Sequence, residues 1–257
     1  LNILKMERFM KSILITGAAS GIGAATVRKL ATKNISFTLT TKSNEEDLEL
    51  IAQYARRKGA SVNTLCGDLS NKNFLETLIN LARNETGIID QFVANAGYAN
   101  KQKFGEFSDE EINQSIQTMA ISFSSIINLC LEDFKKSNNA RIITISSFVN
   151  KTIGLNDNIF PTTAAAKGAL EALTKTLAYQ LAKYDVTVNS ISPGYTKKDG
   201  THSALSPEEW KKIISKIPLS RLAKPKDIAN MISFLLSKQA SYITGQIIKV
   251  DGGLSLI

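Results

Sequence analysis

Three closely spaced glycines near the amino terminus have an arrangement suited to binding phosphate. Gly17, Gly21 and Gly23 follow the apolar run 13–15 and precede residues 24–27, which have helical spacing. Glycine is needed at such a turn because the backbone takes positive φ and must approach a pyrophosphate without a Cβ in the way. The amides of the following helix then face the phosphate charge. The pattern predicts a strand, turn and helix that bind a dinucleotide. The residues expected to line this turn are Gly17, Ala19, Ser20, Gly21, Ile22 and Gly23.

The elements that must position this turn alternate along the chain. Strand-like runs are separated by helix-like runs throughout, which predicts parallel strands joined by crossover helices. No linker of changed composition and no short repeat divides the 257 residues, so we expect a single domain. The strands are expected at Ser12–Thr16, Ser36–Thr40, Ser61–Cys66, Gln91–Ala94, Arg141–Ser146, Thr187–Ile191 and Gln246–Val250.

Capping signals mark several helix starts. Capping boxes are expected at Ser43 with Glu46, at Ser108 with Glu111, and at 206–209, where proline takes the first helical position. The polar stretch before the last of these is long enough to form a lid. We therefore expect an N-terminal extension at 1–10, a domain at 11–257, and a lid at about 196–216.

Composition narrows the setting and the partners. The chain is 43% apolar with a net charge of +8, but its basic residues are scattered among acidic neighbours, so we expect no nucleic-acid partner. No apolar run approaches the ~18 residues of a membrane span, and the first residues do not form a secretory signal. The two cysteines, Cys66 and Cys130, fall in a predicted strand and a predicted helix. We expect both to be reduced core residues in a cytoplasmic protein.

A set of further motifs follows the glycine turn along the chain. They are Asp68-Leu69, Asn95-Ala96-Gly97, Ser146-Ser147, Lys167, Asn189, Ser192-Pro193-Gly194, and the tail at 243–253. With these motifs the chain resembles the short-chain dehydrogenase/reductase family over nearly its whole length, and it is most similar to the branch of 3-oxoacyl-carrier-protein reductases. The resemblance implies a doubly wound parallel sheet (a Rossmann fold), NAD(P) at the carboxyl ends of the strands, a small-molecule substrate, and a homo-oligomer, either a tetramer or a dimer.

The resemblance also assigns the cofactor contacts. Asp68, next to Leu69, follows the third strand, where the family's carboxylate accepts a hydrogen bond from the adenine amino group; a plain turn aspartate is the alternative. Small residues at Asn95-Ala96-Gly97 let the ribose approach the backbone, although Asn95 could equally tie strands together. Pro193, Gly194 and Thr196 lie on the nicotinamide side.

The end of the second strand predicts which dinucleotide binds. Family members specific for NAD usually place an acid there to accept from the ribose 2′-hydroxyl. This chain has Thr41 at that position and Lys42 beside it. A carboxylate would repel a 2′-phosphate, whereas lysine and hydroxyl groups would hold it. We expect NADP(H) to be preferred over NAD(H), with no metal; a solvated surface lysine is the alternative for Lys42.

The reactive end departs from the family pattern. The resemblance implies that Ser147 holds the substrate oxygen and that Lys167 binds the nicotinamide ribose. It also implies that a tyrosine four residues before the lysine donates the proton. Thr163 stands at that position, and Met119 aligns with the asparagine that supports the family's water relay. The tyrosine position of enoyl reductases, seven residues before the lysine, is Phe160.

The absence of a tyrosine at the expected position leaves two functions open. A phenol has a pKa near 10, and an aliphatic hydroxyl is a far weaker acid, so Thr163 cannot simply replace tyrosine. Ser147 and Lys167 could still stabilise an oxyanion while another group supplies the proton. The chain is then either an oxidoreductase acting on a carbonyl, hydroxyl or enoyl substrate, or an inactive nucleotide-binding pseudoenzyme. Tyr98, Tyr195, Lys198 and His202 are rim residues that could instead take part.

Overall fold

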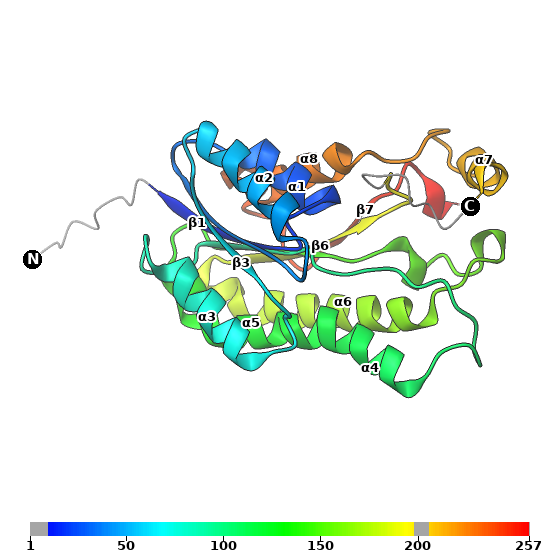
Figure 1. Cartoon of the computed structure of the whole chain (residues 1–257), viewed down its shortest axis with the longest axis horizontal. Helices are drawn as coiled ribbons and strands as arrows, with labels where there is room; N and C mark the ends of the chain where they lie inside the picture. The colour runs from blue at the N-terminus through cyan, green and yellow to red at the C-terminus, as the bar shows by residue number, and fades with distance from the viewer. Residues whose placement is uncertain (1–9, 198–205, 257) are drawn as a thin grey trace, which may run out of the picture.

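The structure is a computed structural model, and it describes residues 10–197 and 206–256. A parallel sheet of seven strands in the order β3-β2-β1-β4-β5-β6-β7 runs through the middle of this part of the chain (Figure 1). Every strand pair is parallel, so each connection must cross back over a face of the sheet. The strands are β1 (Lys11–Thr16), β2 (Ile35–Thr41), β3 (Ser61–Cys66), β4 (Gln91–Ala94), β5 (Arg141–Ile145), β6 (Thr187–Pro193) and β7 (Ile247–Val250).

Helices cover both faces of the sheet (Figure 1). One layer holds α1 (Gly21–Leu30), α2 (Glu45–Arg57) and α8 (Pro225–Leu235). The opposite layer holds α3 (Lys72–Arg83), α4 (Asp109–Ile116), α5 (Ser122–Lys136) and α6 (Pro161–Leu181). A short π-helical turn, Gln117–Ile121, joins α4 to α5. Helix α7 (Pro207–Ser215) lies at the same end of the molecule as the carboxyl terminus.

The burial of the strands explains their continuous apolar character. In β1, Ile13 and Ile15 point into the core between the sheet and α1, α2 and α8, whereas Leu14 points into the core on the other face. Successive side chains of a strand face opposite sides, and here both sides are covered by helices. A strand of this kind therefore carries apolar residues on both faces, and the continuous run Ile13–Ile15 is the pattern that predicted it.

The predicted doubly wound α/β fold is confirmed, and all seven predicted strands exist within one or two residues at each end. The capping boxes at Ser108 and Ser206 are also present. The predicted cap at Ser43 is wrong. Helix α2 begins one residue later, and the Asn44 side chain accepts the Asp47 amide at 3.2 Å. Serine and asparagine are about equally good helix caps, so the sequence alone could not show which of these two neighbouring residues caps α2.

The order of the strands reverses between β1 and β4, and this reversal creates a place for a ligand. To one side the chain proceeds through β2 and β3, and to the other through β5, β6 and β7. The crossovers therefore diverge at the carboxyl ends of β1 and β4, which is where doubly wound sheets bind their ligands. The predicted extension at 1–10 and the predicted lid at about 196–216 stay predictions, since residues 1–9 and 198–205 lie outside the described residues.

Candidate active site

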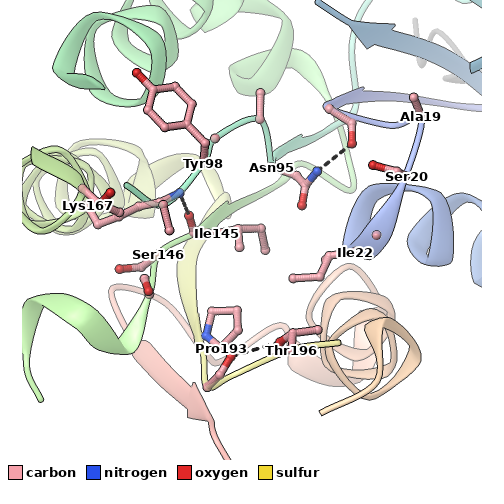
Figure 2. A pocket seen from close by; sticks show the side chains of 18 of the residues that line it. Ala19, Ser20, Ile22, Asn95, Tyr98, Ile145, Ser146, Lys167, Pro193 and Thr196 are labelled. Carbon is pink, nitrogen blue, oxygen red and sulfur yellow. Dashed lines mark hydrogen bonds between the residues drawn. The ribbon is translucent and has the colours of Figure 1, made fainter. Parts of the chain in front are cut away.

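A cavity of about 460 Å³ opens at this reversal point (Figure 2). Segments that are far apart in the sequence build its wall, from the turn after β1 to the residues after β6. It brings together most of the residues predicted to bind the cofactor or to act on the substrate. Those residues are Gly17, Ala19, Ser20, Gly21, Ile22, Thr41, Asn95, Ala96, Gly97, Ser147, Thr163, Lys167, Pro193, Gly194 and Thr196.

The turn after β1 has the backbone that the glycine spacing predicted. Gly17 and Gly21 have φ values of +65° and +54°, a region that side-chain-bearing residues seldom adopt. Gly23 does not line the cavity, and its role is packing: a Cβ there would overlap with the carbonyl oxygen of Gly17. Helix α1 starts at the cavity, and the side chain of its cap residue Ser20 makes no capping hydrogen bond. This end of α1 is therefore available to a negatively charged group.

The residues expected at the adenine end form an ion pair. Lys42 Nζ lies 2.6 Å from Asp68 Oδ2, and Asp68 Oδ1 accepts the amide of Ser70. The pKa of Asp68 is lowered to about 2, mainly by the hydrogen bond from Lys42 and next by the hydrogen bond from the Ser70 amide. Lys42 and Asp68 lie beside the cavity rather than in its wall, and Leu69 is buried in the core. Lys42 is thus not a lysine without a partner.

Asn95 ties β4 to the glycine turn, as one alternative for it predicted. Its Nδ2 donates to the carbonyl oxygens of Thr16 at 3.0 Å and Gly17 at 2.9 Å (Figure 2). Thr16 Oγ1 accepts the backbone amides of Asn95 and Ala96 in return. These contacts hold the two sides of the reversal point together. Asn95 also lines the cavity, so a cofactor contact remains open to it.

Lys167 is a buried cation at the reactive end. Its side chain is 6% exposed, and Nζ donates a 2.6 Å hydrogen bond to the carbonyl oxygen of Ile145 (Figure 2). Burial lowers its pKa to about 8, because a charged ammonium loses hydration in the interior. The amino group lies close to Gly97, where a Cβ would come within 3.0 Å of Nζ. A small residue at position 97 therefore leaves room for the lysine.

Thr163 lies on the same face of α6, one turn before Lys167, and its hydroxyl already has a structural role. Oγ1 accepts the backbone amide of Asn100 at 3.0 Å, and the residue is 1% exposed. It thereby holds the loop after β4 against α6. Ser147 is half-buried after β5, and its Oγ accepts the Val149 amide at 3.4 Å. The serine and the lysine border the same cavity, with a threonine beside them.

The alignment predicts Met119 at the family's asparagine position. Met119 is buried in the π-helical turn between α4 and α5, and its sulfur lies against Gly97. Turns of this type often occur at functional sites. A thioether is only a weak acceptor and cannot donate a hydrogen bond, so Met119 offers little support for a water relay. Phe160, at the other tyrosine spacing, packs against a small apolar cluster that includes Phe148 and Ile213.

Neither rim tyrosine directs its hydroxyl at Lys167. Tyr98 extends toward the helical layer, where its hydroxyl lies 3.3 Å from Ser115 Oγ (Figure 2). The ring of Tyr195 packs against Phe148 and Trp210, at centroid distances of 4.5 and 6.0 Å. Burial is the main cause that raises the pKa of Tyr195, which makes it a weaker acid. Tyr195 therefore serves as a packing residue, whereas Tyr98 lines the cavity with its hydroxyl bonded to Ser115. Lys198 and His202 lie outside the described residues.

The carboxyl-side wall comes from the end of β6. A Cβ at Gly194 would come within 2.8 Å of Asp251 Cα, so the close approach of these segments requires glycine. Thr196 Oγ1 donates to the Gly194 carbonyl oxygen at 3.0 Å, which fixes the turn. Four cavity residues were missed as site residues: Ala99, Ile145, Ser146 and Lys197. Ser146 was noted only as part of a motif, and the Ile145 carbonyl oxygen accepts from Lys167, a backbone contact that no side-chain pattern reveals.

The fold and the cavity together define a class of protein. A doubly wound parallel sheet with a glycine turn at its reversal point is a nucleotide-binding fold of the Rossmann type. A family model described as "Enoyl-(Acyl carrier protein) reductase" matches residues 17–255. The chain belongs to the short-chain dehydrogenase/reductase family, as a member similar to 3-oxoacyl-carrier-protein reductases.

Its relatives cover nearly the whole chain. The 3-oxoacyl-[acyl-carrier-protein] reductase FabG of Haemophilus influenzae is 34% identical over 96% of this chain and 98% of its own length. FabG of Rickettsia felis is 36% identical over the same shares. A short-chain dehydrogenase/reductase from Serratia marcescens has a TM-score of 0.87 at 25% identity, covering 96% of this chain and 99% of its own. YwfH, an NADPH-dependent reductase involved in bacilysin biosynthesis, has a TM-score of 0.86 at 26% identity, covering 95% and 98%.

The family implies a nicotinamide cofactor, and the described residues fit one. Gly17 and Gly21 have positive φ and no Cβ, so the backbone is accessible where a pyrophosphate would lie. The cavity continues from there to Lys167. Within residues 10–197 and 206–256, no cluster of histidine, cysteine and acidic residues has the arrangement of a metal site. None of the helices in these ranges is both long and apolar enough to span a bilayer.

Proposed function

We propose that this protein is an NADP(H)-dependent oxidoreductase that acts on a carbonyl, hydroxyl or enoyl substrate without a tyrosine as its proton donor. The observation that carries the proposal is the meeting of the glycine turn, Ser147 and buried Lys167 around one cavity, with Thr163 four residues before the lysine. A bound nicotinamide supplies or accepts the hydride.

The charge at the end of β2 supports NADP(H) over NAD(H). The strand ends at Thr41, which lines the cavity, and no acid stands there to accept from a ribose 2′-hydroxyl. Lys42 already holds one carboxylate, that of Asp68, and its side chain is 66% exposed. An exposed ammonium can turn from a carboxylate to a phosphate at little cost, because surface ion pairs are worth only about 0–1 kcal/mol. One of the solved neighbours, YwfH, is NADPH-dependent.

Ser147 and Lys167 suit the stabilisation of an oxyanion. The serine hydroxyl can donate to a substrate oxygen, and the ammonium adds positive charge in a largely water-free wall, where charge interactions are stronger. The proton would then come from water or from the substrate. An enoyl substrate fits this arrangement, because an enolate held by these two groups can be protonated later by water.

The alternative is a nucleotide-binding pseudoenzyme, and one observation favours it. The Thr163 hydroxyl accepts the Asn100 amide, and Met119 cannot replace the amide of an asparagine, so both side chains serve packing rather than chemistry. The dinucleotide turn is complete in either case. A sensor or an inactive partner subunit would keep the turn and lose the proton route.

The two proposals separate in one experiment. The fluorescence of NADPH and NADH is titrated with the protein, and NADPH oxidation is then followed with a panel of β-keto esters and enoyl thioesters. The oxidoreductase predicts tighter NADPH binding and turnover of at least one substrate, whereas tight binding without turnover favours the pseudoenzyme. Rejection of both dinucleotides refutes both.

The variant T163Y tests the proton route, with T163F as a control of similar bulk without the hydroxyl. If the site is otherwise competent, T163Y raises carbonyl reduction by up to about 10²-fold, the scale of a positioned acid, and T163F does not. Equal rates in the two variants would contradict the assignment of position 163. K167A should weaken NADPH binding under either proposal.

A further inference from the structure

A buried carboxylate on α6 has no part in the function proposed above. Glu171 follows Lys167 by one helical turn and Thr163 by two, so the three side chains share the face of α6 that packs against β5. Glu171 is 7% exposed. A carboxylate is costly to bury unless it is paired and hydrogen-bonded. The role of Glu171 can therefore be inferred from its hydrogen-bond and ion-pair partners.

The first partner lies immediately before Ser147. Ser146 Oγ donates a 2.6 Å hydrogen bond to Glu171 Oε1, and both residues are buried. One turn earlier on α6, Lys167 Nζ donates to the carbonyl oxygen of Ile145. Two consecutive turns of α6 thus hold the two residues that precede Ser147. Hydrogen bonds that involve an ionised group are about twice as strong as neutral ones.

The second partner lies on the far side of Ser147. Lys151 Nζ is 3.2 Å from Glu171 Oε2, so the carboxylate also holds the end of the short turn that follows the serine. The backbone amide of Lys151 donates to the Phe148 carbonyl oxygen at 2.9 Å, which closes this turn. A single carboxylate therefore connects the residues on both sides of Ser147 to the helix that carries Lys167.

Ser147 depends on this connection because its own contacts are weak. The one side-chain hydrogen bond of Ser147 in the described contacts is the long one from the Val149 amide, at 3.4 Å. Both serines border the cavity, but the Ser146 hydroxyl is bonded to Glu171, whereas Ser147 follows in extended backbone, with φ −158° and ψ 157°. The place of Ser147 in the cavity wall therefore depends on the backbone that Ser146 holds against α6.

We propose that Glu171 is a positioning residue for Ser147, which it orients toward the cavity by binding Ser146 and Lys151 from α6. The proposal rests on the proposed function only in that Ser147 then contacts a substrate; the positioning itself is a property of the protein alone.

The variant E171A tests this, and T174V is its matched control. Thr174 lies on the same buried face of α6, and its hydroxyl bonds to the Thr144 hydroxyl on β5 at 2.9 Å and to the Leu170 carbonyl oxygen, so its hydrogen bonds do not involve residues 145–151. Hydrogen exchange of the full-length protein is measured without any ligand. E171A should speed exchange of the amides of Val149 and Lys151 by about tenfold or more, because their opening no longer breaks the carboxylate contacts. T174V should not.

Enzyme activity is the second measurement on E171A. E171A should lower kcat with a β-keto ester by about 10–100-fold, the usual effect of a catalytic group displaced by about an ångström. NADPH affinity should stay unchanged, because Glu171 does not border the cavity. E171Q should recover part of the rate, since its side-chain oxygen can still accept from Ser146 although the charge facing Lys151 is lost.

The outcomes distinguish this proposal from the proposed function. If exchange at 149–151 is the same in E171A and T174V, Glu171 does not position this segment and the inference is wrong. If the exchange result holds but the parent protein turns over no substrate, the oxidoreductase fails and the positioning stands. A fall of NADPH affinity together with kcat in E171A would show a general loss of structure and would also overturn the inference.

Discussion

Replacing Lys167 by methionine should change the stability of the protein in a pH-dependent way that its burial dictates. The lysine is buried, its pKa is lowered from 10.5 to about 8 by loss of hydration, and no carboxylate in 10–197 or 206–256 offsets this shift. K167M keeps the length and bulk of the side chain and removes the titrating group. The comparison therefore isolates the cost of the buried ammonium.

The magnitude follows from the two pKa values. A difference of one pKa unit corresponds to about 1.4 kcal/mol, so the lowered pKa amounts to about 3 kcal/mol. Between the two values the unfolded chain binds the proton and the folded protein does not, so the free energy of unfolding rises with pH there. Below the folded value both states are protonated and the full penalty applies. From about pH 7 to about pH 9.5 the lysine should contribute a rise of about 2 kcal/mol.

The assay is urea-induced unfolding of both proteins at these two pH values. The free energy of unfolding of the parent, minus that of K167M, should increase by about 2 kcal/mol over this range. The remaining lysines cancel in this difference because both proteins contain them. A difference that stays constant with pH would refute the reasoning, since it would mean that Lys167 ionises as it does in water.

Three further predictions concern other parts of the molecule. K42M should weaken NADPH binding by about tenfold while NADH binding changes little, and NMR titration should find the pKa of Asp68 returned from about 2 toward 3.8; equal losses for both dinucleotides would contradict the role of Lys42. G23A should abolish dinucleotide binding in the fluorescence titration, because its Cβ would overlap with a carbonyl oxygen of the turn; retained binding would show that the turn can shift. Cys130 should resist iodoacetamide in the native protein while partly exposed Cys66 reacts, since burial raises the pKa of the Cys130 thiol. Mass spectrometry measures the labelling of each cysteine, and equal labelling of the two would contradict this prediction.

The sheet could be predicted because its signals are local. Strands β1, β4 and β5 each contain a short apolar run, and burial on both faces produces such runs directly. The ion pair of Lys42 and Asp68 could also have been predicted from the sequence. In parallel strands β2 and β3 the pairing of Thr41 with Cys66 brings the residues that follow to the same edge. The expectation that both would contact one dinucleotide already implied that they lie close together.

The contacts of Glu171 could not be predicted in this way. Its partners lie 25 and 20 positions earlier in the sequence, and no spacing rule links a helix residue to a loop at that distance. The role of the Thr163 hydroxyl was missed for a related reason. The alignment predicted only that Thr163 stands in place of a phenol, whereas the structure shows the Asn100 amide that the hydroxyl accepts. Long-range polar contacts depend on how the elements pack, which periodicity does not encode.

The hydrogen bonds between Asn95 and the first turn have a further consequence. They cross the boundary between the half of the sheet that carries the glycine turn and the half that carries Ser147 and Lys167. A dinucleotide that binds against the first half should also restrain the second, because the pairing of β1 with β4, the Thr16 hydroxyl and the Asn95 side chain join the two. Occupancy of the nucleotide site should therefore stiffen the substrate wall before any substrate arrives, so that the two molecules bind in a preferred sequence, cofactor first.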